Sequence, residues 1–592
     1  MTKNDVGATL KSDGTATFRV WAPFAVHVAV CGTFNNWERL TLTAEGDGYW
    51  SVTVPNAAAG QEYTYVLTTA IGQELAKNDP RALQVETAEG NSVLVDTTFD
   101  WEGDTFTPPA YNRQVLYELH IGTFNRPDAA QSGTFETATA KLDYLQSLGI
   151  NMVELMPINS MYMDRGWGYA PAYLYAIESL YGGRRAFLEF VKAAHQRGIG
   201  VIVDVVYNHF GPDGIDLWRF DGWYENDKGG IYFYNDWRAT TAWGDTRPDF
   251  GRTEVREYIL GSVAMWFRDC HVDGLRFDST NYLRNVAGQN GRPDQDIPEA
   301  WSLLQEANKL AHQLNPAGIT IAEDMANEYI TKPVGEGGAG FDSQWEVGFP
   351  HQLRDVLLPL FDADRNLHAI QDALTHIYNG NAAQRIVFND SHDVAHDARL
   401  NEAIAPTDAA SLPARQRSLL AAVLVLTAPG IPMLFQGQEF MQPGGFNDWH
   451  GLDWEQAETF AGMVQAHQHL IALRRNVYGH SGGLLGSNIN ILLLDEPSKL
   501  LAYHRWGVGG AGDDVVVVIN FANTTTENQR VPFPRDGRWI TRWQSDWKGY
   551  SDDFGSVAGP EAAGADGTGT LSIGPYAASV LSQEPEPANA DE

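Results

Sequence analysis

The stretch GVIVDVVY, residues 200–207, decides the fold class of this chain of 592 residues. Its apolar side chains follow one another with little polar alternation, which is typical of a strand buried on both faces of a parallel sheet. Residues 115–121 and 150–156 show the same pattern earlier in the chain. Together these runs predict the inner strands of a parallel sheet.

Helical patterns lie between these runs. Phe187, Phe190, Val191 and Ala194 share one face of a helix, and Gly198 follows them as a stop signal. Because strand and helix alternate from residue 109 to about residue 475, we expect a repeated βα fold. The alternation alone fits both a closed barrel and an open doubly wound sheet.

The two ends of the chain follow a different period. Apolar positions recur at every second residue in segments between residues 17 and 67, and again in residues 489–494, 500–506, 515–521 and 577–581. These segments predict antiparallel β domains. We therefore divide the chain into an N-terminal β-sandwich (1–108), a βα unit (109–475), a C-terminal β-sandwich (476–583) and an acidic tail (584–592).

A long excursion interrupts the βα pattern between residues 210 and 250. It follows the third strand, and it is rich in aromatic residues, among them Trp218, Trp223, Tyr232, Trp237 and Trp243. This position is typical of a loop domain that binds substrate. The aromatic side chains fit two interpretations: a small core of the excursion itself and, for one or two of them, stacking on a sugar.

Composition excludes several classes of function. The formal charge of −34 opposes binding to nucleic acid or to anionic membranes, but it places no limit on a neutral substrate. No apolar run approaches the roughly 18 to 20 residues that span a bilayer, and the start lacks the apolar region of a signal peptide. We therefore expect a cytoplasmic protein. Cys31 and Cys270 are too few for a disulfide scaffold or a cysteine zinc site.

Four segments end apolar runs with polar residues. They are residues 204–209 (DVVYNH), 276–278 (RFD), 323–324 (ED) and 390–393 (DSHD). In a βα barrel the C-terminal ends of all strands open on one face, so residues remote in sequence converge there. A lone aspartate at a strand end is more often a helix cap or an ion-pair partner. Four such ends with histidine and arginine among them indicate a catalytic site.

These segments, in this order and at these intervals, resemble the signature regions of the α-amylase superfamily of retaining glycosidases and transglycosylases. The resemblance covers about residues 17–581. It implies a fold of the α/β class, a (β/α)8 barrel between an N-terminal β-sandwich and a C-terminal antiparallel β domain, with a loop domain after barrel strand 3. It also implies an α-glucan or maltooligosaccharide substrate, and it implies no organic cofactor.

The resemblance assigns roles to individual residues. Asp278 is similar to the nucleophile, Glu323 to the general acid and base, and Asp393 to the carboxylate that holds the 2- and 3-hydroxyls of the distorted sugar. Five others are similar to residues that orient the nucleophile or bind the sugar: Tyr169, Asp204, His209, Arg276 and His392.

The chemistry agrees with these roles. Retaining cleavage needs two carboxyl groups about 5 to 5.5 Å apart, one ionised to attack and one protonated to release the leaving oxygen. Arg276 lies two residues before Asp278 on the same side of its strand, so its cation keeps the nucleophile ionised. Neighbouring carboxylates disfavour a further charge, so we expect Glu323 to hold its proton until the glycosidic oxygen takes it.

Within the superfamily, the 1,4-α-glucan branching enzymes are the most similar group. Residues 319–324 (ITIAED), 333–342 (PVGEGGAGFD) and 391–393 (SHD) resemble their sequences. The chain departs from them at Ser279, Thr280 and Asn281, which follow Asp278, and at Asp390. We expect these neighbours to line the subsites that select the acceptor and the linkage.

Two other functions stay open. Residues 165–169 (RGWGY) and 204–212 (DVVYNHFGP) resemble the maltooligosyltrehalose trehalohydrolases instead. In a transferase a sugar hydroxyl attacks the covalent intermediate, whereas in a hydrolase water does so. The third possibility is an inactive glucan-binding protein, because a fold alone does not imply activity.

Two binding sites also stay open. Residues 18–23 (FRVWAP) and 32–37 (GTFNNW) resemble the β-sandwich module that precedes the barrel in branching and debranching enzymes, a module that binds glucan in some members. Trp37 fits both an exposed position and a core position. Asp213, Asp216 and Asp221 could ligate calcium, but they lack EF-hand spacing, so we expect solvated loop charges and predict no metal ligand.

Overall fold

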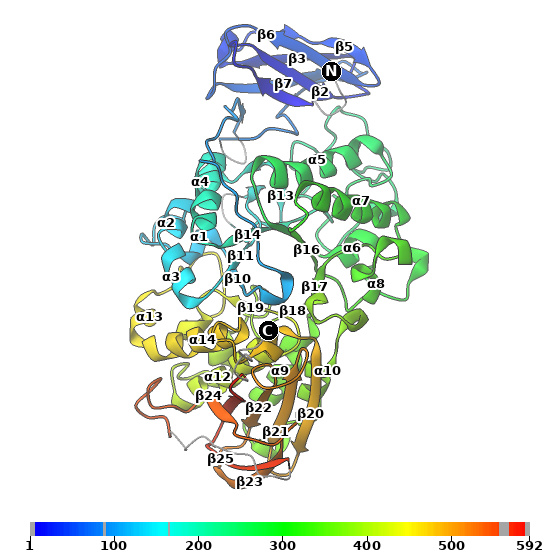
Figure 1. Cartoon of the computed structure of the whole chain (residues 1–592). Coiled ribbons are helices and arrows are strands. Elements are labelled where there is room, and N and C mark those ends of the chain that lie inside the picture. The colour runs from blue at the N-terminus through cyan, green and yellow to red at the C-terminus, as the bar shows by residue number, and fades with distance from the viewer. Residues whose placement is uncertain (1–5, 87–89, 164–165, 556–566, 586–592) are drawn as a thin grey trace, which may run out of the picture. The chain divides into compact units, whose positions relative to one another are not determined.

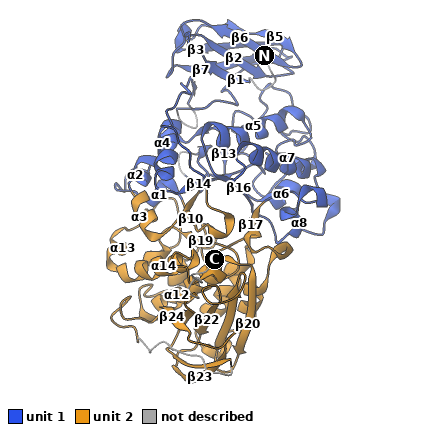
Figure 2. Cartoon of the chain, in the orientation of Figure 1, with its two compact units in different colours: residues 1–107, 120–140, 155–341 blue, residues 108–119, 141–154, 342–592 orange. Residues whose placement is uncertain are grey.

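The computed structural model describes residues 6–86, 90–163, 166–555 and 567–585. Residues 586–592 of the predicted acidic tail and Arg165 lie outside the described residues. Contacts divide the chain into two compact units, which are coloured separately in Figure 2. The first unit holds residues 1–107, 120–140 and 155–341, and the second holds residues 108–119, 141–154 and 342–592.

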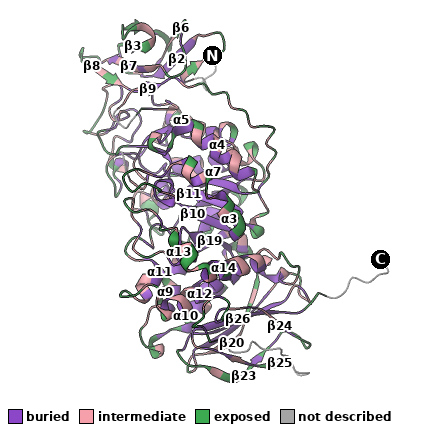
Figure 3. Ribbon diagram, turned by 90° about the vertical axis from the view of Figure 1, so that its left-hand side faces the viewer, coloured by how far each residue is buried: buried purple, intermediate pink, exposed green. Residues whose placement is uncertain are grey.

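The apolar run at residues 200–207 forms strand β14 (Gly200–Val205), which is buried along its whole length. It is one of eight strands that close into a barrel, so the closed alternative of the βα fold is the one that forms. The barrel strands that are labelled in Figure 3 are coloured as buried. In barrel order the other seven are β10 (Leu116–Leu119), β11 (Met152–Leu155), β15 (Gly274–Phe277), β16 (Ile319–Ala322), β17 (Ser343–Trp345), β18 (Arg385–Val387) and β19 (Ile431–Phe435), with β14 after β11.

Neighbouring barrel strands run parallel and in close register. Asp204 pairs with Arg276, and Arg276 pairs with Ile321, so strands β14, β15 and β16 end side by side. Gly274 permits this approach, because a Cβ atom there would lie 2.6 Å from Cγ2 of Ile319. The register therefore fixes which side chains meet at the strand ends.

Helices alternate with the strands, as the sequence predicts (Figure 1). Helix α4 (Gly183–His195) buries Phe187, Phe190, Val191 and Ala194, which is the predicted face. The remaining helices are α1 (Ile121–Phe124), α2 (Phe135–Thr139), α3 (Leu142–Leu148), α5 (Thr253–Asp269), α6 (Thr280–Arg284), α7 (Pro298–Leu314), α8 (Glu328–Thr331), α9 (Gly348–Leu357), α10 (Leu367–Thr375), α11 (Leu400–Ile404), α12 (Leu412–Thr427), α13 (Glu455–Thr459) and α14 (Ala461–Arg474). None of the helices in the described part of the chain is both long enough and apolar enough to cross a membrane.

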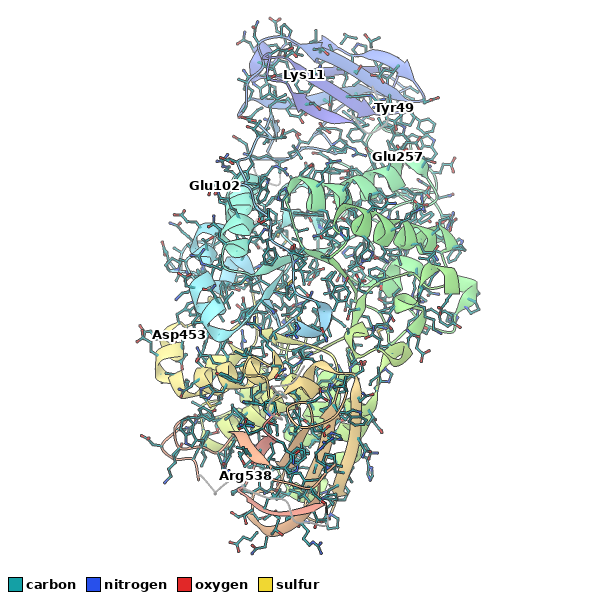
Figure 4. The ribbon with its side chains drawn as sticks, in the orientation of Figure 1. Lys11, Tyr49, Glu102, Glu257, Asp453 and Arg538 are labelled. Atoms are coloured by element: carbon teal, nitrogen blue, oxygen red, sulfur yellow. The ribbon has the colours of Figure 1, made fainter. Side chains whose placement is uncertain are left out.

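The N-terminal module, in the first unit, consists of two antiparallel sheets. One contains β1 (Gly7–Leu10), β2 (Ala16–Trp21), β6 (Tyr49–Val54) and β5 (Thr43–Gly46), and the other contains β4 (Leu40–Thr41), β3 (His27–Gly32), β7 (Glu62–Thr68), β8 (Glu74–Lys77) and β9 (Ser92–Val93). Phe18 and Tyr63 pack edge to face inside the sandwich, with ring centroids 4.9 Å apart. Tyr49, labelled in Figure 4, lies under the guanidinium of Arg19. Trp37 remains 41% exposed, so it is not a core residue.

The excursion after β14 has little regular structure, and its aromatic residues divide between the two interpretations. Trp223 stacks on Phe24 of the N-terminal module, and Tyr232 packs edge to face on Trp21. Tyr232 is therefore part of a packed layer, whereas Trp237 and Trp243 stay about half exposed at 55% and 47%. The hairpin β12 (Asn159–Met161) and β13 (Pro171–Ile177) lies in the same unit.

The C-terminal domain, in the second unit, is antiparallel, as predicted. Its main sheet has the order β20 (Asn488–Asp495), β21 (Leu500–Trp506), β22 (Val515–Asn520), β26 (Ala577–Ser582) and β24 (Ile540–Gln544), beside the pair β23 (Thr526–Pro532) and β25 (Thr568–Ile573). Leu500, Val516, Val531 and Trp539 pack in one buried core. The predicted fold class is confirmed, while the domain boundaries remain a prediction.

Candidate active site

Arg276 on β15 is the centre of the candidate site. Its guanidinium is fully buried and contacts three carboxylates of the first unit. Nη1 lies 2.6 Å from Oδ2 of Asp204 and 3.1 Å from Oδ1 of Asp278, while Nη2 lies 2.7 Å from Oε2 of Glu323. Strand order explains this convergence, because β14, β15 and β16 are neighbours and their last residues share one edge.

The charge of Arg276 is maintained by these neighbours. Burial alone would lower the pKa of Arg276, but the charges of Asp204, Glu323 and Asp278 outweigh burial and raise it well above the usual value. A buried cation with three anionic partners in turn favours the ionised form of each of them. An ionised Asp278 is what its predicted role as nucleophile requires.

Asn208 holds the candidate nucleophile in position. Its side-chain amide donates to Oδ2 of Asp278 at 2.6 Å and to the backbone oxygen of the same residue at 2.8 Å. Asp278 is only 7% exposed, so this bond and the ion pair with Arg276 restrict its rotation. The sequence contained the signal for Asn208 in the motif DVVYNH, but its neighbour His209 was predicted as the site residue instead.

Ser279 bonds to the candidate acid and base. Its backbone N–H donates to Oε2 of Glu323 at 2.9 Å, and its hydroxyl lies 3.4 Å from the same oxygen. The backbone of Ser279 has φ +40°, a left-handed conformation that is unfavourable for a residue with a side chain. This strained turn aims the N–H at Glu323, and nothing in a sequence pattern predicts it.

The contact between Arg276 and Glu323 bears on the expected proton of Glu323. A cation 2.7 Å away favours the ionised carboxylate, which opposes the effect of the neighbouring anions. The protonated resting state of Glu323 remains a prediction. For Glu323 to be protonated, a bound sugar must first weaken its ion pair with Arg276.

Tyr169 and Asp204 form a second layer around Arg276. The hydroxyl of Tyr169 donates to Oδ2 of Asp204 at 2.7 Å, and the ring centroid lies 6.0 Å from the guanidinium carbon of Arg276. Gly168, at φ +93°, directs this tyrosine, because a Cβ atom at Gly168 would collide with the carbonyl oxygen of Pro157. Asp204 is 2% exposed, so its contacts support a positioning role.

His209 is buried beside the same tyrosine. Its Nε2 lies 2.9 Å from the backbone oxygen of Tyr169, and its Nδ1 contacts Oδ1 of Asn208. Burial lowers the pKa of His209 to about 4, so the ring is neutral at pH 7. Trp243 of the excursion stacks on the ring with centroids 4.4 Å apart, which shows that the excursion reaches the candidate site.

His392 and Asp393 belong to the second unit, where they follow β18. Nδ1 of His392 lies 2.5 Å from Oε1 of Glu118 on β10, and the backbone N–H of His392 donates to the other carboxylate oxygen at 3.2 Å. The imidazole Nε2 lies 3.4 Å from Asp393, whose side chain is 57% exposed. Glu118 thus orients His392, a role that the apolar pattern around residue 118 did not reveal.

The expectation that the unusual neighbours line subsites is wrong for Thr280 and Asp390. Thr280 is fully buried and donates to the backbone oxygen of Glu323, and Asn281, at 7% exposed, donates to the backbone of Gly288. Asp390 is 1% exposed and pairs with Arg354 at 2.7 Å. Thr280 and Asp390 therefore support the site through internal bonds. Asn281 is as exposed as Asp278, so its place in a subsite stays a prediction.

The acidic residues of the excursion differ in their surroundings. Among the described residues, no group of three or more histidine, cysteine or acidic side chains is placed to hold a metal ion. Asp221 is 1% exposed and accepts bonds from the backbone N–H groups of Phe24 and Trp223. The prediction of a solvated charge is therefore wrong for Asp221, which instead joins the excursion to the N-terminal module.

Comparison with known families agrees with the geometry. Residues 119–237 and 215–471 match the family described as "Alpha amylase, catalytic domain". This chain belongs to the α-amylase family. Residues 5–82 of this member match "Carbohydrate-binding module 48 (Isoamylase N-terminal domain)", and residues 492–584 match "Alpha amylase, C-terminal all-beta domain".

Individual relatives of this α-amylase family member include branching enzymes. The 1,4-alpha-glucan branching enzyme GlgB of Corynebacterium jeikeium is 32% identical over 556 residues, which cover 89% of this chain and 75% of that protein. The enzyme of the same name from Lactiplantibacillus plantarum is 32% identical over 563 residues, covering 90% of this chain and 86% of that protein. The predicted superfamily is confirmed.

Solved structures share the fold. A pullulanase from Paenibacillus barengoltzii superposes with a TM-score of 0.77 at 22% identity, covering 98% of this chain and 95% of that one. A putative α-amylase from Salmonella typhimurium gives a TM-score of 0.74 at 22% identity, covering 98% of this chain and all of that one. At this identity the likeness concerns the fold alone.

Proposed function

We propose that this chain is a 1,4-α-glucan branching enzyme, which cleaves an α-1,4 link and transfers the glucan segment to a 6-hydroxyl. The observation that carries the proposal is the bridge made by Arg276 between Asp278 and Glu323, at the ends of neighbouring barrel strands. The similarity to the branching enzymes of two bacterial genera supports the choice within the family. The substrate is then an α-glucan or a maltooligosaccharide.

The reaction proceeds through two displacements. The carboxylate of Asp278 attacks the anomeric carbon while Glu323 donates its proton to the leaving glycosidic oxygen, which gives a covalent glycosyl ester. The 6-hydroxyl of the acceptor then gives its proton to Glu323 and attacks the same carbon, releasing Asp278. Two inversions retain the α configuration.

The surrounding residues prepare these steps. Arg276 and Asn208 hold Asp278 ionised and oriented, and Asp204 positions Arg276. We further propose that Tyr169 stacks on the sugar at the cleavage point. His209, His392 and Asp393 then bind its hydroxyl groups, with Asp393 on the 2- and 3-hydroxyls of the distorted ring.

A second candidate function is the hydrolysis of maltooligosyltrehalose. The motif Trp167-Gly168-Tyr169 and residues 204–212 favour it, although Arg165, the first residue of the motif RGWGY, lies outside the described residues. The same two carboxylates serve both reactions, and only the attacking group differs. The domain boundaries at residues 108, 475 and 583 and a cytoplasmic location complete the proposal.

Proton NMR of the products tests the proposal. After incubation with amylose, we expect new anomeric signals of α-1,6 links without a matching rise in reducing ends. A rise in reducing ends without new links would instead identify a hydrolase, and release of free trehalose from a trehalose-capped maltooligosaccharide would identify the second candidate. Asp278→Asn separates both from an inactive glucan-binding protein, because it should abolish turnover while glucan binding remains.

A further inference from the structure

A groove of about 410 Å³ lies beside the segment that carries Glu323. Its walls come from the end of α6, the start of α7 and the turn around α8, which are labelled in Figure 1. The volume falls within the range of roughly 300 to 1,000 Å³ that is typical of small-molecule sites. The lining residues that matter here are Arg284, Asp296, Pro298, Trp301, Asn327 and Tyr329.

The groove is joined to the candidate acid and base by direct bonds. Arg284 donates from Nε and Nη2 to the two carboxylate oxygens of Asp324, at 2.9 and 2.7 Å. Asp324 directly follows Glu323. The backbone N–H of Thr280 donates to the backbone oxygen of Glu323 at 2.8 Å, and the hydroxyl of Thr280 lies 2.9 Å from Oδ2 of Asp324. A continuous set of hydrogen bonds therefore joins the wall of the groove to the segment that carries Glu323.

The lining has the chemistry of a carbohydrate site. Tyr329 is 53% exposed, with the ammonium of Lys332 4.3 Å from its ring centroid, and Trp301 is half-buried. Both rings line the groove. Aromatic faces bind the apolar C–H face of a sugar ring, while a few placed polar groups bind its hydroxyls. Asp296 supplies such a polar group, and its orientation is set by a bond of 2.8 Å from Asn285.

Charge selects a neutral ligand. Arg284 is already paired with Asp324, and Asp296 adds a negative charge, so an anionic ligand would meet repulsion in the groove. The formal charge of −34 acts in the same direction over the whole chain. A neutral α-glucan is not repelled by the groove or by the net charge of the chain.

We propose that this groove binds the acceptor glucan chain, with Trp301 and Tyr329 as its stacking residues. The assignment to the acceptor rests on the proposed function, in which Glu323 takes the proton of the attacking hydroxyl. The acceptor must lie at Glu323 for this step, and the groove is built on the segment next to Glu323. Continuity with that segment is the reason for preferring the acceptor over the donor chain.

Two-substrate kinetics test the proposal. α-Maltotriosyl fluoride serves as the donor, because fluoride release reports formation of the glycosyl enzyme, and maltoheptaose serves as the varied acceptor. For Trp301→Ala and Tyr329→Ala we expect the acceptor KM to rise about tenfold, while the donor KM changes by less than about twofold. An unchanged acceptor KM, or an equal rise in the donor KM, would overturn the proposal.

Matched variants separate stacking from folding. Tyr329→Phe keeps the ring and should restore the acceptor KM to within about twofold of the wild type. Tyr478→Ala removes another exposed tyrosine, 63% exposed and in the second unit, and should leave the acceptor KM unchanged. Melting temperatures of all variants show whether the fold is intact.

A direct binding measurement keeps the groove testable if the proposed function fails. If the wild type releases no fluoride, calorimetry with maltoheptaose and the Asp278→Asn variant still reports glucan binding. Adding Tyr329→Ala to that variant should weaken binding about tenfold. Equal binding by both proteins would contradict the groove, whatever reaction the enzyme performs.

Discussion

The carboxylates around Arg276 and the carboxyl group of Glu439 are both buried near ends of barrel strands. The first group contacts a buried cation, whereas the side chain of Glu439 accepts hydrogen bonds from neutral hydroxyls. Asp278 lies 3.1 Å from a buried guanidinium. Glu439 follows β19 and is fully buried, with the hydroxyls of Tyr117 and Tyr144 donating to Oε1 at 3.0 and 2.9 Å. Burial raises the pKa of Glu439 to about 7, against a smaller opposing effect of these bonds and of Arg399.

The difference shows what a buried carboxylate needs in order to act as a nucleophile. Neutral donors satisfy the oxygens of Glu439 but leave its charge poorly compensated, so the proton is retained near neutral pH. A full cation in contact, as at Asp278, opposes that retention. Four changes test this contrast, beginning with the largest expected effect.

Asp278→Asn should abolish catalysis. The amide has nearly the shape of the carboxylate but cannot form the glycosyl ester, so we expect turnover to fall by at least roughly 10⁴-fold. Initial rates of fluoride release from α-maltotriosyl fluoride measure the loss. Asp269→Asn, at a half-buried position at the end of α5 and outside the candidate site, is the control and should stay within about twofold of the wild type. A loss of less than a hundredfold in Asp278→Asn would place the nucleophile elsewhere.

Arg276→Leu should destabilise the first unit. The change leaves three carboxylates without their buried cation, and we expect the free energy of unfolding to fall by about 3–5 kcal/mol. Urea denaturation measures it, with the exposed Arg268→Leu as the control. The loss in free energy of unfolding should become smaller as the pH falls toward 4, because the carboxylates that lack a cation then become neutral. A deficit that does not depend on pH would contradict the role given to the cation.

Glu439→Gln should alter the dependence of stability on pH. The folded pKa of Glu439, about 7, lies above the ordinary value of 4.5, so the folded state keeps a proton that the unfolded state releases between these values. Stability from this group is full below pH 4.5 and is lost as the pH rises to 7. Between pH 4.5 and 7, the free energy of unfolding of the wild type should fall by about 3 kcal/mol relative to that of Glu439→Gln. Parallel stability curves for the two proteins would show that Glu439 is ionised throughout.

Ser279→Ala should have the smallest effect. The hydroxyl lies 3.4 Å from Glu323, while the stronger bond comes from the backbone N–H, which the substitution keeps. We expect the rate of transfer to fall by about two- to fivefold. Ser279→Gly also removes the hydroxyl but relaxes the backbone at φ +40°, so it should unfold at a higher urea concentration than Ser279→Ala. A loss of more than a hundredfold in Ser279→Ala would make the hydroxyl part of the reaction.

Most of the fold followed from periodicity. Strands β10, β11 and β14 lie within the predicted apolar runs, because a strand buried on both faces has no polar alternation to obscure it. The short strands β23, β24 and β25 were not predicted. Their residues alternate weakly, and their pairing partners lie far away in sequence.

The sequence predicted the site residues that lie at the ends of strands. It did not predict the roles of residues that depend on which strands are neighbours. Arg276 and Asp278 share a side of one strand, so their contact followed from a period of two. The roles of Asn208 and Glu118 depend on which strands become neighbours, and the turn at Ser279 depends on a strained backbone. Thr280 was misjudged because sequence adjacency to Asp278 does not determine which way a side chain points.

Trapping the sugar on the protein tests the assignment of Asp278 as the nucleophile. In a Glu323→Gln variant, α-maltotriosyl fluoride needs no acid to leave, but the glycosyl ester lacks the base that would discharge it, so the ester should accumulate. Mass spectrometry of digested protein should find a maltotriosyl group on the peptide that contains Asp278. The group should be absent when Asp278→Asn is added. A maltotriosyl group on another residue, or its persistence in the double variant, would contradict the assignment of Asp278 as the nucleophile.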